Sequence, residues 1–253
     1  MNVDLGEYRA SEAEQARVAS LQSLFPSERG SAIDIGARDG YISKVLARIF
    51  GRVVALDLTM PDVVGENITC VEGNVLDLPL EDNTFDLVLC AEVLEHIPPA
   101  QLPRACDELT RIAKGHVLIG VPYRQDTRVG QTTCRSCGKT NPPWGHVNRF
   151  TEDKLKALFP KCSAEKIDFV GTNSEATNWA AATFMTIAGN PFGTYEQDEP
   201  CVHCGAVLVG PASRSFFSKV ATKAGSVCHS LQQPFIKPHP NWIHILFRKN
   251  SGK

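Results

Sequence analysis

The sequence lacks both a long apolar run and a strong net charge. No hydrophobic stretch reaches the roughly 18 residues that a membrane-spanning helix needs, although 43% of the 253 residues are hydrophobic. The formal net charge is −2, so the chain has no global basic field to hold a polyanion. The hydrophobic content predicts a sizeable core, and the lack of a long apolar run predicts that no segment spans a membrane. The small net charge does not favour nucleic acid as a partner, although it leaves that partner open.

The first residues of the sequence do not predict a secretory leader. Residues 1–7 are polar and contain no basic region followed by an apolar stretch. The sequence therefore predicts a cytoplasmic protein. In a reducing compartment, closely spaced cysteines indicate metal binding before disulfides, and this chain has nine cysteines, of which four form two Cys-x-x-Cys pairs.

The stretch around which the chain is organised predicts a strand, a tight turn and a helix. The apolar run 32–35 leads into Gly36 and Gly40, and residues 41–50 have helical periodicity. Glycine suits a turn in which the backbone must approach a ligand closely or adopt a positive φ. The next apolar run ends in Asp57, about twenty residues after the turn, where nucleotide-binding α/β folds place an acid for ribose hydroxyls.

A dinucleotide site and an adenosyl site compete as interpretations of this pattern. The turn reads Gly-x-x-x-Gly, with Asp34 two residues before the first glycine, and it lacks the Gly-x-Gly-x-x-Gly pattern that seats a pyrophosphate. The sequence therefore favours a cofactor without phosphates.

Four motifs in this order carry a family resemblance. They occupy residues 32–40, 52–57, 71–80 and 83–97. Together they resemble class I S-adenosylmethionine-dependent methyltransferases, in particular the type 11 group, over roughly residues 30–170. The resemblance implies a doubly wound, Rossmann-like, mostly parallel seven-stranded α/β sheet with helices on both faces. It also implies S-adenosylmethionine as cofactor and favours O-methylation of a small molecule, a sugar, or a glycan or lipid intermediate, with carbon and nitrogen acceptors left open.

The resemblance also implies roles for individual residues. Asp34 would act near the amino-acid end of the cofactor, Asp57 would accept both ribose hydroxyls, and Leu58 would pack on the adenine. The family usually has an acid where Asn74 stands, so the adenine contact would pass to the Asn74 carbonyl or be shared with Asp77. The remaining cofactor-binding positions that it implies are Gly36, Arg38, Gly40, Val75 and Cys90.

Two histidines are candidates for a general base, because histidine titrates near neutrality. His96 lies just past the predicted fourth strand, and His146 follows the fifth and is expected to face the same cleft. Each can instead be structural, in a loop or a lid. The sequence Cys-Ala-Glu-Val at 90–93 replaces the Asn/Asp-Pro-Pro-Tyr/Phe motif of enzymes that methylate exocyclic amines of bases, so that class is disfavoured.

The most specific addition to the family pattern is a pair of Cys-x-x-Cys-Gly motifs, at Cys134/Cys137 and Cys201/Cys204. Two such knuckles supply four thiolates to a tetrahedral zinc ion. A redox dithiol and a catalytic metal are alternatives, but four thiolates leave no open coordination position, which favours structural zinc in a small zinc-ribbon-like insertion.

The predicted organisation has four parts. They are an N-terminal helix or cap at 1–29, a cofactor-binding core at 30–171, an irregular insertion at 172–235 that carries the second knuckle, and a C-terminal strand at 236–253. A helix is expected within 11–25, with a capping box formed by Ser11 and Glu14. Further helices are predicted near 40–50, 60–65, 100–113 and 151–159, and strands near 32–35, 53–57, 68–71, 85–90, 116–121, 166–170 and 242–248.

Two rival functions remain at this stage. One is an RNA or protein methyltransferase that uses the zinc element to hold a polymer, for which basic residues between 124 and 149 are suggestive. The other is a binding module on a catalytically idle fold. The apolar residues within 211–235 favour a helix that covers the core over one that lies on a membrane.

Overall fold

The chain forms two compact units in the computed structural model, which describes residues 5–250. Residues 1–4 of the predicted N-terminal cap and 251–253 of the predicted C-terminal segment lie outside the described part. We call the larger body the sheet unit; it comprises the described residues of Arg9–Tyr123, Phe150–Gly171 and Pro240–Lys253. We call the other body the cysteine unit; it comprises the described residues of Met1–Tyr8, Arg124–Arg149 and Thr172–His239.

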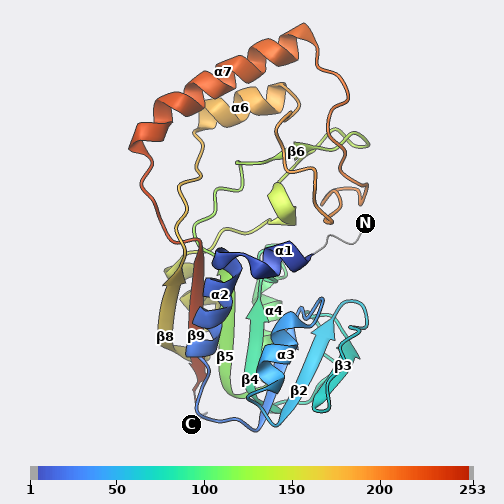
Figure 1. Cartoon of the computed structure of the whole chain (residues 1–253), viewed down its shortest axis with the longest axis vertical. Helices are drawn as coiled ribbons and strands as arrows, with labels where there is room; N and C mark the ends of the chain where they lie inside the picture. The colour runs from blue at the N-terminus through green and yellow to red at the C-terminus, as the bar shows by residue number, and fades with distance from the viewer. Residues whose placement is uncertain (1–4, 251–253) are drawn as a thin grey trace. The chain divides into compact units, whose positions relative to one another are not determined.

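The sheet unit is built on a seven-stranded sheet with the strand order β3-β2-β1-β4-β5-β9-β8 (Figure 1). Strands β1 to β5 pair in parallel, and β9 is antiparallel to both β5 and β8. The strands are β1 (Ser31–Ile35), β2 (Arg52–Asp57), β3 (Ile68–Glu72), β4 (Phe85–Ala91), β5 (Ala113–Pro122), β8 (Cys162–Val170) and β9 (Trp242–Lys249). This confirms the predicted mostly parallel α/β sheet.

Helices cover both faces of this sheet. Alternate residues of a strand point to opposite faces, and on β4 Val88 and Cys90 join one apolar cluster while Leu87 and Leu89 join the other. The first cluster includes side chains of α4 (Leu102–Ile112) and α5 (Glu152–Leu158), and the second includes those of α2 (Glu12–Ser23) and α3 (Tyr41–Ala47). Strands buried on both faces read as continuous apolar runs, which is why the sequence shows them clearly.

Helix α2 begins where its cap residue predicts, but the capping box is only half formed. The Ser11 hydroxyl accepts the Glu14 amide at 3.2 Å. Among the described residues, the Glu14 carboxylate makes no bond back to the cap; it accepts two hydrogen bonds from Arg17, at 2.7 and 2.8 Å, and one from Arg9, and it is fully buried. The expected reciprocal bond is therefore replaced by a buried ion pair.

Ser20 attaches α2 to the antiparallel end of the sheet. Its hydroxyl donates to Asp168 on β8 at 2.6 Å and lies 2.7 Å from His244 Nδ1 on β9. The single serine proton goes to the carboxylate, so Nδ1–H of His244 is the donor to the serine oxygen. Burial, reinforced by the charge of Arg17, lowers the pKa of His244 to about 3 and keeps the ring neutral.

The helix expected at 60–65 is absent. This segment contains Pro61, β-branched Val63 and Val64, and Gly65, which disfavour a helix. Val63 is instead buried against Ala37 and Ala55.

The cysteine unit has little regular structure apart from two helices. It contains β6 (Thr132–Thr133), β7 (Thr140–Asn141), η1 (Pro143–Gly145), α6 (Trp179–Ile187), α7 (Phe216–Gln232) and η2 (Gln233–Phe235). Helix α1 (Leu5–Ala10) crosses the boundary between the units. The sequence pattern did not reveal α6 because its nine residues include no charged side chain, so no amphipathic alternation marks it. Among residues 5–250, no helix is long and apolar enough to span a membrane.

Candidate functional site

The glycine turn and Asp57 are joined by hydrogen bonds at the carboxyl ends of β1 and β2. The amides of Gly36 and Ala37 both donate to the Leu56 carbonyl, at 2.8 and 3.0 Å. The Arg38 amide donates to Asp57 Oδ2 at 2.8 Å, and the Leu58 amide to Oδ1 at 2.6 Å. Each carboxylate oxygen thus holds one backbone amide and keeps further lone-pair capacity, which suits it to two adjacent ligand hydroxyls.

Backbone conformation explains the two glycines. Gly36 has φ 80° and Gly40, the cap residue of α3, has φ 70°. At Gly40 a β-carbon would also lie 2.2 Å from a methyl of Val63. Arg38 between them has φ 46° as well, so the whole turn is tightly coiled. Beside it, Leu58 is 67% exposed, an apolar surface next to Asp57 on which a flat ring can pack.

Asp34 is the buried acid of the site. It is 3% exposed on β1 and accepts the Ser43 hydroxyl at 2.6 Å. Burial, with a contribution from the charge of Asp57, raises the pKa of Asp34 to about 6. Because the Asp34 carboxylate is buried, it is better suited to hold a ligand through neighbouring side chains or a water molecule than by direct contact at the surface.

The segment after β3 only partly matches the adenine contact that the sequence predicts. Asn74 is exposed, and its side-chain carbonyl already accepts the Leu76 amide at 2.9 Å. Val75 is buried in the core, and the Asp77 side chain is 88% exposed. Cys90 is fully buried, and burial raises the pKa of its thiol well above the ordinary value, so the thiol is a packing group.

His96 is held neutral by its surroundings. Burial, and then the positive charge of Arg38, lowers the pKa of His96 to about 4. A ring with this pKa is unprotonated at neutral pH but is a weak proton acceptor.

His146 belongs to the cysteine unit and is 8% exposed. Its Nδ1 lies 2.6 Å from Gln125 Oε1. Because an amide oxygen only accepts, Nδ1 carries the proton and the neutral ring has its lone pair on Nε2. In this tautomer Nε2 is the nitrogen that can accept a proton, as a general base must.

The sequence reasoning did not weigh two carboxylates, Glu92 and Glu95. Glu92 takes a positive φ of 58° directly after β4, and its Oε2 accepts Trp242 Nε1 at 3.3 Å. Glu95 is fully buried, and neither of its carboxylate oxygens has a hydrogen-bond partner among the described residues. Burial, and then the nearby Glu92, raises the pKa of Glu95 well above its usual value. The sequence could have revealed them, because Glu92 and Glu95 are two acids within a largely apolar segment.

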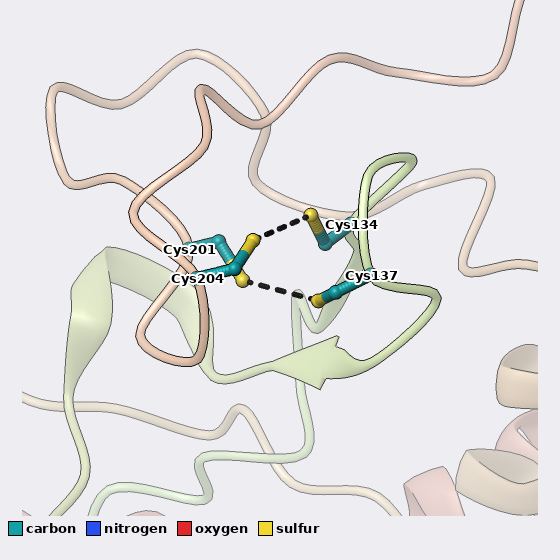
Figure 2. Close-up of side chains that lie close together, drawn as sticks. All are labelled: Cys134, Cys137, Cys201 and Cys204. Carbon is teal, nitrogen blue, oxygen red and sulfur yellow. Dashed lines mark hydrogen bonds between the residues drawn. The ribbon is translucent and has the colours of Figure 1, made fainter.

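The four cysteines of the two knuckles meet within the cysteine unit (Figure 2). The sulfur of Cys134 lies 3.7 Å from that of Cys204, and Cys137 lies 3.7 Å from Cys201. All four sulfurs lie within 4.8 Å of one another. Zinc–sulfur bonds of about 2.3 Å in a tetrahedron put sulfurs about 3.8 Å apart, so the spacing suits one zinc ion, and it is far too long for disulfides.

The two knuckles have the same backbone hydrogen bonds. The Gly138 amide donates to the Cys134 carbonyl at 2.9 Å, and the Gly205 amide to the Cys201 carbonyl at 2.8 Å. Both glycines have φ 72°, and a β-carbon at either would meet nothing within 4 Å. Glycine is therefore required by backbone conformation and not by lack of space.

Without a bound cation, the pKa values of two cysteines in this cluster are shifted in opposite directions. Burial would raise the pKa of Cys201, but the amides of His203 and Cys204 outweigh it and lower that pKa to about 6. At Cys204 the Ala206 amide has the lowering effect, yet burial and three neighbouring sulfurs raise the pKa to about 12. Four thiolates at this spacing need a cation to neutralise them.

The family comparison concerns the sheet unit. Residues 33–119 match a family model described as a methyltransferase domain. An alignment 119 residues long, which covers 43% of this chain, is 30% identical to the ubiquinone biosynthesis O-methyltransferase of Ralstonia nicotianae and covers 50% of that protein. The protein of the same description from Albidiferax ferrireducens is 26% identical over 119 residues, 42% of this chain and 47% of that protein. The chain thus spans about half the length of these curated relatives.

Solved structures share the fold. The N-methyltransferase NodS from Bradyrhizobium japonicum WM9, in complex with S-adenosyl-L-homocysteine, matches with a TM-score of 0.56 and 16% identity over 99% of this chain and 94% of that chain. SpnF, a cyclase, matches with a TM-score of 0.55 and 13% identity over 95% of this chain and 82% of that chain. Because one of these two proteins is a cyclase, the shared fold does not by itself fix the reaction.

Proposed function

We propose that this protein is an S-adenosylmethionine-dependent methyltransferase. The observation that carries the proposal is Asp57, held at the end of β2 by the amides of Arg38 and Leu58, directly beside the glycine turn. The match of residues 33–119 to a methyltransferase domain supports the same activity.

The residues of the sheet unit fit this cofactor. Asp57 would accept the two ribose hydroxyls, and exposed Leu58 would cover one face of the adenine. The Asn74 carbonyl would contact the adenine amino group only through its remaining lone pair, since Leu76 takes the other. Asp34 would position the amino-acid end, directly or through water.

When bound, the cofactor supplies an electrophilic methyl group, and the protein's main task is to align an acceptor in line with it. A base is needed where the accepting atom must lose a proton. We assign that role to His146, whose tautomer is set by the contact of Nδ1 with Gln125, ahead of His96, whose low pKa makes it a weak acceptor.

We propose O-methylation of a small molecule, a sugar, or a glycan or lipid intermediate. The O-methyltransferase description of the distant relatives supports this class of acceptor. Two of the basic residues that suggested a polymer are used within the cysteine unit: Arg128 bonds Asp126 at 2.8 Å, and Arg135 donates to the Gly210 carbonyl. This weakens the RNA or protein alternative.

We also propose that Cys134, Cys137, Cys201 and Cys204 bind one structural zinc ion. Four sulfurs at tetrahedral spacing, donated by two knuckles with matching backbone hydrogen bonds, support this metal.

Calorimetry with S-adenosylhomocysteine tests the proposed activity. We expect micromolar affinity for the wild type and, for Asp57→Ala, a loss of about 2 kcal/mol or more, because two charge-assisted hydrogen bonds disappear. Asp57→Asn should lose less, since its amide oxygen still accepts. Asp107→Ala is the matched control, an exposed acid on α4 that pairs with Lys161, and should bind as the wild type does. Tight binding of NAD without any response to S-adenosylhomocysteine would overturn the proposal.

A further inference from the structure

Helix α7 is folded with its small residues inward and its large residues outward. Its buried face is formed by Ala221, Thr222 and Gly225. At Gly225 a β-carbon would lie 3.2 Å from the Ala181 carbonyl and from a methyl of Met185, so the two helices cross closely there. Figure 1 shows α7 lying along α6. The side chains that α7 buries are therefore small ones.

The large apolar side chains of α7 form one stripe on its opposite face. At roughly 100° per residue, they fall within an arc of about 100°. Phe216 and Phe217 are 75% and 82% exposed. We call these residues the α7 stripe: Phe216, Phe217, Val220, Val227 and Leu231, all exposed. Phe235 in the following η2 turn is 82% exposed and extends the apolar surface beyond the helix end.

Basic residues accompany the stripe, and acids are missing. Lys219 and Lys223 are exposed and lie on one side of the stripe, within roughly 60° of its edge on the helical wheel. Lys237 follows the helix and is exposed, whereas Arg214, which precedes it, bonds Thr222 on the buried face of α7. The sequence from 200 to 253 contains no aspartate or glutamate. The helix is about 25 Å long over 17 residues, and its apolar stripe with two lysines beside it is complementary to an anionic lipid surface.

We propose that α7 docks the protein on the surface of anionic membranes, with the α7 stripe among the acyl chains and the lysines at the headgroups. A second copy of the chain is a poorer occupant, because two α7 helices in contact would bring like charges together without acids to balance them. The sequence favoured a core-covering helix here. Helix α7 does cover α6, but with the face opposite the apolar stripe.

The test is sedimentation of the full-length protein with vesicles of phosphatidylcholine containing about 30% phosphatidylglycerol, and with vesicles of phosphatidylcholine alone. We expect binding to the anionic vesicles that weakens in 0.5 M salt. The variant Phe217→Ser/Leu231→Ser should lower the partition coefficient roughly tenfold or more, because two apolar side chains no longer enter the bilayer. Lys219→Gln/Lys223→Gln should lower it by roughly 30-fold.

Matched controls separate this surface from general charge and hydrophobicity. Val207→Ser changes an exposed valine of the same unit outside α7, and Lys114→Gln/Lys166→Gln removes the same charge from the sheet unit. Both should bind vesicles as the wild type does, and all variants should keep the wild-type melting temperature. The proposal fails if the wild type ignores anionic vesicles, if the controls lose binding equally, or if Phe217→Ser/Leu231→Ser instead dissociates a dimer in solution without changing vesicle binding.

Discussion

At the scale of single residues, the main feature is a set of acids whose protonation depends on burial. Asp34, Glu92 and Glu95 all have raised pKa values, with burial as the first cause in each case. The folded protein therefore binds protons at these groups that the unfolded chain would release. Cofactor alignment would depend on Asp34, whose position on β1 is secured by Ser43.

This gives a prediction for the pH dependence of stability. The pKa of Asp34 is about 6 when folded against 3.8 in the reference state, so its contribution to stability is fully present below pH 3.8 and is lost as the pH rises through 6. The loss is about 3 kcal/mol. Asp34→Asn cannot ionise and should escape this loss, while its amide oxygen still accepts from Ser43.

The measurement is urea unfolding of the cofactor-free protein and the variant at several values between pH 4 and 7. The difference between their free energies of unfolding should change in favour of Asp34→Asn as the pH rises. Glu92 and Glu95 act in the same direction in both proteins and cancel. Parallel profiles would contradict the buried, proton-binding role of Asp34.

At the scale of elements, the two knuckles depend on each other. Each has its own backbone hydrogen bonds, yet each supplies only two sulfurs, so neither binds zinc firmly alone. Bound metal would tie residues 134–137 to 201–204 and contribute folding free energy to the segments between them.

Replacing one thiolate tests that dependence. Cys137→Ser should reduce the metal content from about one zinc per chain to well below it and should lower the melting temperature, because a site with three thiolates binds more weakly. Cys228→Ser, a half-buried cysteine of α7 outside the cluster, should keep its zinc. Wild-type protein purified without metal, or a disulfide within a knuckle, would refute the zinc assignment.

At the scale of the whole molecule, the proposed cofactor residues and the cysteines belong to different units. The β1 turn and Asp57 lie in the sheet unit, and both knuckles lie in the cysteine unit. The bonds that hold Asp57, from Arg38 and Leu58, are all made within the sheet unit.

Metal removal should therefore affect the units unequally. With a strong zinc chelator, amide hydrogen exchange should accelerate in and between the knuckles, because the constraint on residues 134–137 and 201–204 is lost. Protection of β1, β2 and β4 should change little, and affinity for S-adenosylhomocysteine should change less than about twofold. Loss of protection throughout the sheet would show instead that the units fold as one cooperative body.

The sequence by itself determined the parts whose cause is local. Apolar runs of strand length marked the doubly buried strands, and Ser11 marked the start of a helix, since it accepts the amide three residues on. The helix predicted near 151–159 begins in the same way, with Thr151 accepting the Lys154 amide. The spacing of Cys-x-x-Cys-Gly likewise fixed each knuckle. It did not identify α6, which has no charged side chain and so no periodic pattern, and it placed a helix at 60–65 where Val63 is drawn into the core.

Only the tertiary structure decided what depends on neighbours distant in the chain. Glu14 and Arg17 form a buried ion pair instead of a capping box because α2 packs against β8 and β9, strands that lie far along the chain from it. The four sulfurs converge because residues 64 to 70 positions apart fold together. The α7 stripe is exposed because close packing against α6 at Gly225 selects the small face of the helix. Burial and charge at these places are set by packing, which no local pattern specifies.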